Sequence, residues 1–266
     1  MSYLNRVFLQ NKLGVVFHLN LTNETSKHLK KICKKFGIDI FFTPKEITKE
    51  EHEILNHARP FTLTYDQAML SLIDAVEYIE KNKIKGDFVE CGVWKGGSIL
   101  IITKTLQKLG INNRDIYLFD TFEGMNIPTD KDIGLNDEIA TKEYKKDKFY
   151  LKNIKISLEH VKKVVLGTGY DKSKFHFIKG KVEDTLPKNN PKSIALLRLD
   201  TDWYESTKHE LECLFPLLSK GGILIIDDYT TWTGAKKATD EYFQKNNIQF
   251  FLNRIYPQGQ RIGVKI

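Results

Sequence analysis

The stretch DFVECGVWKGGS, from Asp87 to Ser98, gives the clearest indication of the fold. Its apolar start is typical of a short buried strand, Gly92 follows that strand, and Gly96 and Gly97 lead into a helical pattern that continues to Leu109. Glycines let the backbone approach a ligand closely, and a helix N-terminus offers free N–H groups. The stretch therefore predicts a strand, a turn and a helix with a ligand at the turn, although many tight turns of this kind are purely structural.

The residues around the first glycine separate two classes of nucleotide ligand. Dinucleotide enzymes place G-x-G-x-x-G over a pyrophosphate, whereas this stretch reads E-x-G-x-x-x-G-G-S. Glu90 disfavours a pyrophosphate because two anions would meet there, and it favours a ligand with a cationic amine. S-adenosylmethionine carries such an amine beside its sulfonium group.

The next expected strand, Ile116 to Asp120, also ends in an acid. A carboxylate at that position can accept hydrogen bonds from both ribose hydroxyls of a nucleoside. Asp120 therefore favours a nucleoside ligand in general rather than the methyl donor alone. A helix cap or an ordinary loop acid is the structural alternative.

Further along the chain, strand and helix patterns alternate. The expected strands cover residues 87–91, 116–120, 175–179, 194–199, 223–227, 250–254 and 261–265. The expected helices cover residues 65–82, 98–109, 156–166, 205–218 and 234–245. This alternation predicts an α/β fold with a mostly parallel sheet and helices on both faces. Residues 121–149 lack periodicity and are long for a loop, so they are a candidate lid.

The first 60 residues differ from the rest. Residues 22–36 have the pattern of a basic amphipathic helix, Gly37 is placed to end it, and residues 38–42 resemble a short strand. A second helix is expected from Pro44 to about Asn56. We therefore expect an N-terminal helical lid or appendage over residues 1–60 and the main domain over residues 61–266.

Composition limits the class of protein. The chain has 266 residues, of which 41% are hydrophobic and 28% charged, and this suits a folded soluble protein. It contains no apolar run near the roughly 20 residues of a membrane span. Its N-terminus lacks the order of a secretory signal, which favours a cytoplasmic location. Three distant cysteines form neither a disulfide framework nor a CxxC metal site.

The net charge of +7 and the pI near 9.0 raise the question of anionic partners. Basic runs such as those around Lys30 and Lys145 are typical of solvated helix faces, and no basic motif interleaved with aromatic residues indicates nucleic-acid binding. We therefore expect no nucleic acid as a partner. The charge mildly favours a phosphorylated or nucleotide-linked small molecule.

Two further apolar runs end in acids. LLRLDTDWYEST places Asp200 after one expected strand, and GGILIIDDYTTW places Asp227 and Asp228 after another. Ligands of open parallel sheets lie beyond the carboxyl ends of the strands, where these three carboxylates would repel one another unless a cation bridged them. Oxygen ligands alone suit Mg²⁺. Asp202 is expected to cap the helix from about Glu205, and caps or solvated loop groups are the alternative for all four acids.

Together these stretches resemble the macrocin-type (TylF) O-methyltransferase family. The matching motifs run in the family's order over roughly residues 58–245: ARPFT, FVECGVWKGGS, LFDTFEGM, KGKVEDTLP, LLRLDTDWYEST and GGILIIDDY. The resemblance implies a Rossmann-like class I methyltransferase fold with an N-terminal lid. It also implies S-adenosylmethionine and Mg²⁺ as cofactors and a hydroxyl of a small, sugar-like acceptor as substrate.

The resemblance also suggests roles for particular residues. Glu90 and Asp120 match the positions that hold the amino-acid end and the ribose of the donor, and Val182 falls near the adenine. The expected donor-binding set is completed by Thr62, Gly92 and Ser98. The expected metal ligands are Asp200, Asp227 and Asp228.

The expected base is Asp200, acting as metal ligand and base together. Related catechol enzymes carry a lysine at the position of Trp203, so that base is missing here. His160 and His209 are rival bases, although both fall in expected helices. Trp203, Tyr204 and Trp232 could form walls of the pocket, and packing is the alternative for each of them.

Two other function classes remain open from the sequence. One is a non-catalytic, nucleoside-binding regulatory protein on the same fold, against which the intact metal acids argue. The other is an NAD-dependent dehydrogenase, against which the missing G-x-G-x-x-G argues. The sequence leaves the acceptor and the oligomeric state open, with a homo-oligomer among the alternatives, and its Lys, Asn and Ile content favours surface glycan biosynthesis over antibiotic tailoring.

Overall fold

The computed structural model describes residues 5–10, 16–21, 39–42, 47–134, 139–145, 155–257 and 259–266. The chain divides into two compact units, residues 1–52 and residues 53–266. Each helix within the described ranges is too short or too polar to cross a bilayer.

The first unit contains a small antiparallel sheet. Its strands are β1 (Asn5–Gln10), β2 (Val16–Leu21) and β3 (Asp39–Phe42), in the order β2-β1-β3. The expected strand at residues 38–42 corresponds to β3, while the helix expected at residues 22–36 lies outside the described residues. The helical appendage expected over residues 1–60 did not include strands β1 and β2. In β2, apolar residues alternate with His18 and Asn20, which is the period of a half-buried strand.

Helix α2 (Lys49–Ala58) begins later than the sequence indicated. Its start is a capping box, in which Thr48 Oγ1 accepts the Glu51 N–H at 3.2 Å and the Glu51 carboxylate accepts the Thr48 N–H at 2.6 Å. A short 3₁₀ helix, η1 (Arg59–Phe61), follows α2 and leads to Thr62.

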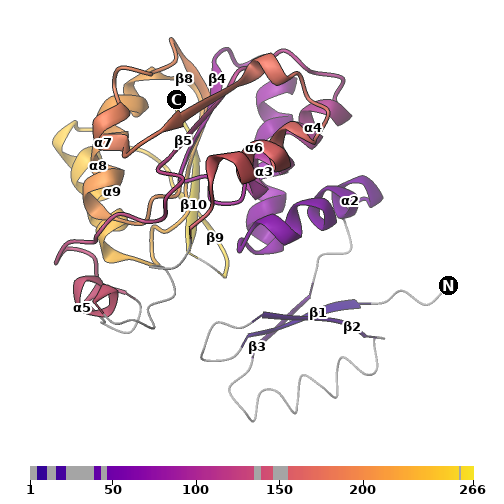
Figure 1. The fold of residues 1–266 in the computed structure, drawn as a ribbon, viewed down its shortest axis with the longest axis horizontal. Helices are drawn as coiled ribbons and strands as arrows, with labels where there is room; N and C mark the ends of the chain where they lie inside the picture. The colour runs from indigo at the N-terminus through magenta and orange to yellow at the C-terminus, as the bar shows by residue number, and fades with distance from the viewer. Residues whose placement is uncertain are drawn as a thin grey trace. The chain divides into compact units, whose positions relative to one another are not determined.

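The second unit is built on a seven-stranded sheet (Figure 1). Its strands are β4 (Asp87–Cys91), β5 (Ile116–Asp120), β6 (Phe175–Lys179), β7 (Ile194–Leu199), β8 (Leu218–Ile226), β9 (Asn253–Ile255) and β10 (Gln260–Val264). Their order is β6-β5-β4-β7-β8-β10-β9, in which β10 runs antiparallel to both of its neighbours and every other pair is parallel. The direction of winding reverses between β4 and β7, which is where open α/β sheets bind ligands.

Helices cover both faces of this sheet (Figure 1). One face carries α3 (Asp66–Lys81), α4 (Gly97–Lys108) and α6 (Leu158–Leu166), and the other carries α7 (Val182–Thr185), α8 (Tyr204–Leu214) and α9 (Thr233–Lys245). The shorter helices of this unit are α5 (Ala140–Tyr144), η3 (Lys172–Lys174) and η4 (Phe215–Leu217). The expected α/β fold, a mostly parallel sheet with helices on both faces, is confirmed.

The core consists of two layers that follow the period of the strands. Phe88 and Leu196 belong to the layer under α3 and α4, while Val89 and Leu197 belong to the layer under α8 and α9. Side chains on a strand alternate between faces, so residues 90 and 198 share the α3 face with residues 88 and 196.

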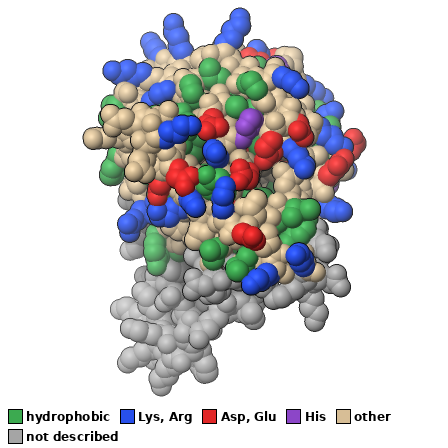
Figure 2. Space-filling view, turned by 90° about the vertical axis from the view of Figure 1, so that its left-hand side faces the viewer, with side chains coloured by type: hydrophobic (Ala, Val, Ile, Leu, Met, Phe, Trp, Pro, Cys, Tyr) green, Lys and Arg blue, Asp and Glu red, His purple; other side chains and the backbone are tan. Residues whose placement is uncertain are grey.

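The surface seen in Figure 2, which includes α8 and α9, mixes charges of both signs. Lysines and arginines lie among acids there rather than in one continuous basic patch. Exposed pairs such as Lys236–Asp240 and Lys245–Glu212 contribute to this mixture. The basic run around Lys30 and residues 146–154 lie outside the described residues, so the interpretation of those runs as solvated helix faces stays a prediction.

Candidate active site

The turn after β4 brings two parts of the sequence into contact. Gly92 has φ +83°, and a Cβ on it would clash with the backbone carbonyl of Asp200. Gly97 begins α4, and a Cβ there would lie 2.6 Å from the Thr62 Cβ. These close approaches explain why glycine occupies both positions. They also place the expected donor-binding residue Thr62 beside the glycine-rich turn.

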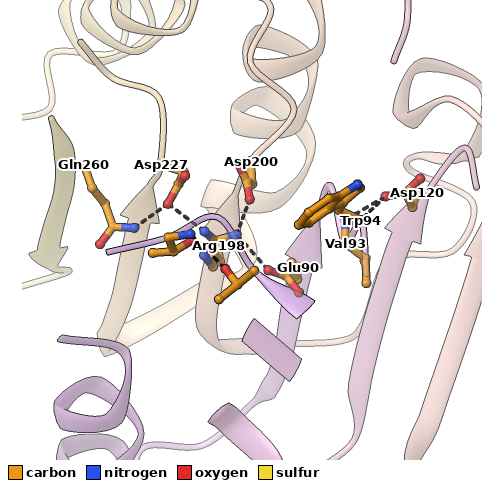
Figure 3. Close-up of polar contacts among 10 residues, drawn as sticks. Glu90, Val93, Trp94, Asp120, Arg198, Asp200, Asp227 and Gln260 are labelled. Carbon is orange, nitrogen blue, oxygen red and sulfur yellow. Dashed lines mark hydrogen bonds and ion pairs between the residues drawn. The ribbon is translucent and has the colours of Figure 1, made fainter. Parts of the chain in front are cut away.

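Asp120 holds the same turn in place (Figure 3). Its Oδ2 accepts the backbone N–H groups of Val93 at 2.7 Å and Trp94 at 3.0 Å, and its Oδ1 accepts that of Phe122 at 2.7 Å. Trp94 has φ +48°, a strained value for a residue other than glycine, so these bonds help to stabilise it. The Thr121 hydroxyl also lies 3.5 Å from Oδ1, so a ligand would share the oxygens of Asp120 with these groups.

Glu90 lies on β4 with a side chain that is only 1% exposed. Its Oε1 accepts a hydrogen bond from Arg198 at 2.8 Å, while Oε2 has no partner among the described residues. Burial raises the Glu90 pKa to about 7, and Arg198 and the nearby Ser98 hydroxyl act in the opposite direction. A buried acceptor without a hydrogen bond is costly, and an ammonium group of a ligand would satisfy it.

Beyond the ends of β7 and β8, three carboxylates gather. Asp200, Asp202 and Asp228 each offer an oxygen, and these oxygens lie within 4.8 Å of one another. All three side chains are partly buried, and burial raises each pKa, that of Asp202 to about 7. Mutual repulsion contributes to these shifts, and a divalent cation would remove it.

This cluster differs from the expected metal set at one member. Asp200 and Asp228 come together as the sequence indicated, but Asp202 joins them. The expectation that Asp202 caps helix α8 is wrong, because the helix begins at Tyr204 with no side-chain cap from its N-cap residue Trp203. Asp202 instead has φ +66°, a left-handed conformation at the end of the strand.

Asp227 is held by two other side chains (Figure 3). Its Oδ1 accepts hydrogen bonds from Arg198 Nη2 at 2.6 Å and from Gln260 Nε2 at 2.5 Å. Gln260 begins β10 and is almost fully buried. Asp227 is therefore a partner of Arg198, and the acidic cluster consists of Asp200, Asp202 and Asp228.

Arg198 was not among the site residues expected from the sequence. It is 2% exposed and contacts three carboxylates, since Nη1 also donates to Asp200 Oδ2 at 2.6 Å. The signal was present in LLRLD, where a charged residue interrupts an apolar strand two positions before Asp200. Two positions is the strand period, so both side chains share one face of the sheet.

With this geometry in view, comparison with known proteins identifies the family. The model of the family described as Macrocin-O-methyltransferase (TylF) matches residues 45–260. The chain belongs to the TylF O-methyltransferase family. It is therefore a methyltransferase, and the dehydrogenase and the non-catalytic binding protein are set aside.

Two curated relatives cover most of the TylF-family region. Demethyldecarbamoylnovobiocin O-methyltransferase of Streptomyces niveus is 30% identical over 214 residues, covering 78% of each chain. The 8-demethyl-8-(2,3-dimethoxy-alpha-L-rhamnosyl)-tetracenomycin-C 4'-O-methyltransferase of Streptomyces olivaceus is 35% identical over 184 residues, covering 69% of this chain and 68% of that protein. Among solved structures, the O-methyltransferase NovP aligns with a TM-score of 0.67 and 26% identity, covering 83% of this chain and 90% of its own.

The segment expected to form a lid in this TylF-family protein is anchored where it is described. Asp132 is fully buried, and its Oδ1 accepts the backbone N–H of Tyr204 at 2.7 Å, which caps α8 from outside the helix. Its Oδ2 accepts the N–H and hydroxyl of Thr129. Residues 135–138 and 146–149 of the expected lid lie outside the described residues.

The aromatic residues near the cluster pack against protein. Trp203 and Trp232 contact each other edge to face, both are buried, and the Trp203 indole donates to the Asn126 carbonyl at 3.0 Å. Tyr204 is also buried, and its hydroxyl donates to Glu241 at 2.5 Å. These contacts fit the packing alternative better than that of exposed pocket walls.

The remaining expected site residues lie on known elements. Val182 is the first residue of α7 and is buried. His160 is exposed on α6, and the His209 ring lies 3.6 Å from Cys213 Sγ, one turn along α8. These contacts give neither histidine a link to the acidic cluster.

Proposed function

We propose that this protein transfers the methyl group of S-adenosylmethionine to a hydroxyl group of a sugar, with the help of a divalent cation such as Mg²⁺. One observation carries the proposal. Five carboxylates lie close together at the carboxyl ends of the central strands. Glu90, Asp200 and Asp227 bond the buried Arg198, and oxygens of Asp202 and Asp228 lie within 4.8 Å of one from Asp200. Such an excess of negative charge is stable only with bound cations or bound protons.

The donor side suits the cationic amino-acid end of S-adenosylmethionine. Glu90 offers a buried, unpaired oxygen for the ammonium group, and Gly92 lets the turn after β4 pack against the Asp200 backbone, beside the acidic cluster. We assign Asp120 to the ribose hydroxyls, which it would bind with the same oxygens that hold the turn. We assign the remaining contacts to Thr62, Ser98 and Val182.

The metal side suits a hard cation. The donor set consists of carboxylate oxygens alone, and the ligands Asp200, Asp202 and Asp228 leave positions for water or an acceptor hydroxyl. A bound Mg²⁺ would lower the pKa of that hydroxyl. Asp227 supports this site through Arg198, and direct ligation by Asp227 remains the alternative drawn from the sequence.

The proton of the acceptor hydroxyl needs a base within the same cluster. Asp200 pairs with Arg198 through Oδ2, so Arg198 already occupies one of its two oxygens. Asp202 offers an oxygen to the same cluster, and among the described residues no arginine or lysine forms an ion pair with it. We therefore assign the base to Asp202 in place of the expected Asp200. As the acceptor oxygen takes the methyl group, its proton passes to Asp202 and S-adenosylhomocysteine is released.

The names of the relatives support a sugar-like acceptor. The Streptomyces olivaceus relative is named for a rhamnosyl-tetracenomycin substrate and a 4'-O-methyl transfer. For this chain, the basic pI near 9.0 favours a phosphorylated or nucleotide-linked sugar, and we place the reaction in surface glycan biosynthesis in the cytoplasm.

A direct test combines binding with turnover. Purified protein should bind S-adenosylhomocysteine in calorimetry and should methylate at least one compound in a panel of phosphorylated and nucleotide-linked sugars, detected as a gain of one CH₂ by mass spectrometry. EDTA should abolish this turnover, and Mg²⁺ or Mn²⁺ should restore it. Full turnover in excess chelator would overturn the metal role while leaving methyl transfer intact.

A further inference from the structure

Arg198 connects the two halves of the candidate active site (Figure 3). Its Nη1 donates both to Glu90 Oε1 at 2.8 Å and to Asp200 Oδ2 at 2.6 Å. Glu90 belongs to the proposed donor side, whereas Asp200 belongs to the acidic cluster. One nitrogen atom therefore holds a carboxylate from each half.

The bridge is set by the register of three central strands. Arg198 on β7 lies opposite Glu90 on β4 and opposite Ile225 on β8. Asp200 and Asp227 follow Arg198 and Ile225 by two residues, so their side chains leave the same face of the sheet. The guanidinium is thus placed by backbone pairing, and its position does not depend on a loop.

Each hydrogen bond from Arg198 occupies one oxygen of a carboxylate and leaves the other oxygen for a different partner. Because Arg198 occupies Oε1 of Glu90, Oε2 is the oxygen left without a partner. Arg198 occupies Oδ2 of Asp200 and leaves Oδ1 without a bond from it, and one Asp200 oxygen lies within 4.8 Å of oxygens of Asp202 and Asp228. The buried guanidinium is fixed by these bonds, since an unpaired charge at 2% exposure would be very costly.

We propose that Arg198 is a positioning residue that couples binding of the methyl donor to binding of the divalent cation. It orients Glu90 toward the donor's ammonium group and Asp200 toward the metal, through the shared Nη1 atom. This inference rests on the proposed function, because both ligands belong to it. Its consequence is that a change at Arg198 alters both affinities, although Arg198 contacts neither ligand.

Lysine at this position separates charge from geometry. Arg198→Lys keeps the positive charge but offers one nitrogen on a flexible stem, which cannot reach Glu90, Asp200 and Asp227 together. The matched control is Arg114→Lys. Arg114 is also largely buried and bonds Glu80 and two backbone carbonyls at the opposite edge of the sheet.

The experiment measures binding without turnover. Calorimetry gives the affinity for S-adenosylhomocysteine in the absence of metal, and electron paramagnetic resonance gives the affinity for Mn²⁺ in the absence of nucleoside. We expect Arg198→Lys to weaken each by about tenfold or more, the scale of a lost charge-assisted hydrogen bond. We expect Arg114→Lys to lower the melting temperature and to change neither affinity by more than about twofold.

A double-mutant cycle separates positioning from general loss of structure. If Arg198 acts on the donor through Glu90, Arg198→Lys should have little further effect on S-adenosylhomocysteine binding once Glu90→Gln is present. Glu90→Gln alone should weaken Mn²⁺ binding severalfold, because it frees Arg198 to move toward Asp200. This second measurement decides the matter if Arg198→Lys fails to fold.

The outcomes are distinct. Failure of the wild-type protein to bind S-adenosylhomocysteine or Mn²⁺ would overturn the proposed function itself. Wild-type binding with unchanged affinities in Arg198→Lys, additive effects in the cycle, or unchanged Mn²⁺ affinity in Glu90→Gln would overturn the coupling and leave the proposed function in place.

Discussion

Arg114 lies at the amino ends of the strands of the large sheet and Arg198 at their carboxyl ends. These two ends are called the amino edge and the carboxyl edge, and the two arginines have very different surroundings there. At the amino edge, Arg114 bonds one carboxylate, Glu80 at 2.6 Å, and the carbonyls of Ile84 and Gly86. At the carboxyl edge, Arg198 bonds three carboxylates. The first arrangement balances its charges, whereas the second leaves an excess of negative charge.

The difference shows where the fold is used for stability and where for function. Nearby at the amino edge, Asp115 is matched by Lys174 at 3.1 Å and His176 at 2.7 Å. At the carboxyl edge, Asp202 and Asp228 add to the excess, and Glu90 keeps an oxygen without a partner among the described residues. A folded protein tolerates such an excess of negative charge at a site where bound ligands balance it.

The largest expected effect tests this contrast on activity. Asp202→Asn removes both a metal ligand and the proposed base, so turnover should fall by roughly 10² to 10⁴-fold, the usual contribution of a general base. Arg114→Met should lower the melting temperature instead and leave the turnover of the folded fraction within about twofold. The measurement is turnover on an acceptor found in the sugar panel, normalised to folded protein.

Asp227 bonds Arg198 and Gln260 and lies outside the acidic cluster, so it is the counterpart to Asp202. If the geometry holds, Asp227→Asn should retain Mn²⁺ binding that Asp202→Asn loses. The reverse result would restore the metal set expected from the sequence and would make Asp202 a bystander.

The second effect concerns pH and the stability of the ligand-free protein. The Glu90 pKa is raised by burial from 4.5 to about 7, so the folded state holds this proton more tightly than the unfolded state. Stability therefore falls as pH rises through the window from 4.5 to about 7. One such shift corresponds to at most on the order of 3 kcal/mol, or roughly 6 to 12 °C in melting temperature.

Glu90→Gln isolates that contribution. In EDTA, the wild-type protein should melt at a higher temperature near pH 5 than near pH 8, and Glu90→Gln should reduce the difference. Saturating S-adenosylhomocysteine should also reduce it, because its ammonium group compensates the ionised carboxylate. An identical pH profile for wild type and variant would argue against a raised Glu90 pKa.

The sequence predicted the strands better than the side chains that face each other across them. β4, β5, β6 and β7 have the expected bounds because each is a short apolar run between polar or glycine residues. β8 begins at Leu218, five residues before the expected start. The later start was predicted because Lys220, Gly221 and Gly222 have the pattern of a turn. Gly221 does have φ +80°, so the local pattern was correct although the strand continues through it.

The site was only partly predictable for a geometric reason. Asp200 and Asp228 follow strands that any α/β interpretation makes parallel, so their meeting could be expected. The roles of Asp202 and Asp227 depend on a left-handed φ of +66° at Asp202 and on a hydrogen bond from Gln260, which lies 33 residues beyond Asp227 on an antiparallel strand. Neither feature has a signal in the local sequence.

The third effect sharpens the role of Asp120, which has two tasks. Asp120→Ala should weaken S-adenosylhomocysteine binding at least about tenfold, because it removes the expected ribose contact and releases the N–H groups of Val93 and Trp94. Asp120→Asn keeps one acceptor oxygen and should show a smaller loss. Equal affinity in wild type and Asp120→Ala, measured by calorimetry, would sink the donor assignment.

The smallest expected effect comes from Asp132, an acid at the carboxyl edge whose two oxygens both accept hydrogen bonds from protein groups. Asp132 is fully buried and accepts bonds from the Tyr204 N–H and from Thr129, so it resembles the amino-edge groups more than its neighbours in the cluster. Asp132→Ala should cost about 1 to 2 kcal/mol of stability, the usual cost of a lost helix cap. It should leave the affinities for S-adenosylhomocysteine and Mn²⁺ within about twofold. Glu205→Gln, which breaks only the exposed pair with Lys131, is the control and should cost less than about 1 kcal/mol. A tenfold loss of ligand affinity in Asp132→Ala would mean that position at the carboxyl edge, rather than unbalanced charge, marks the functional acids of this fold.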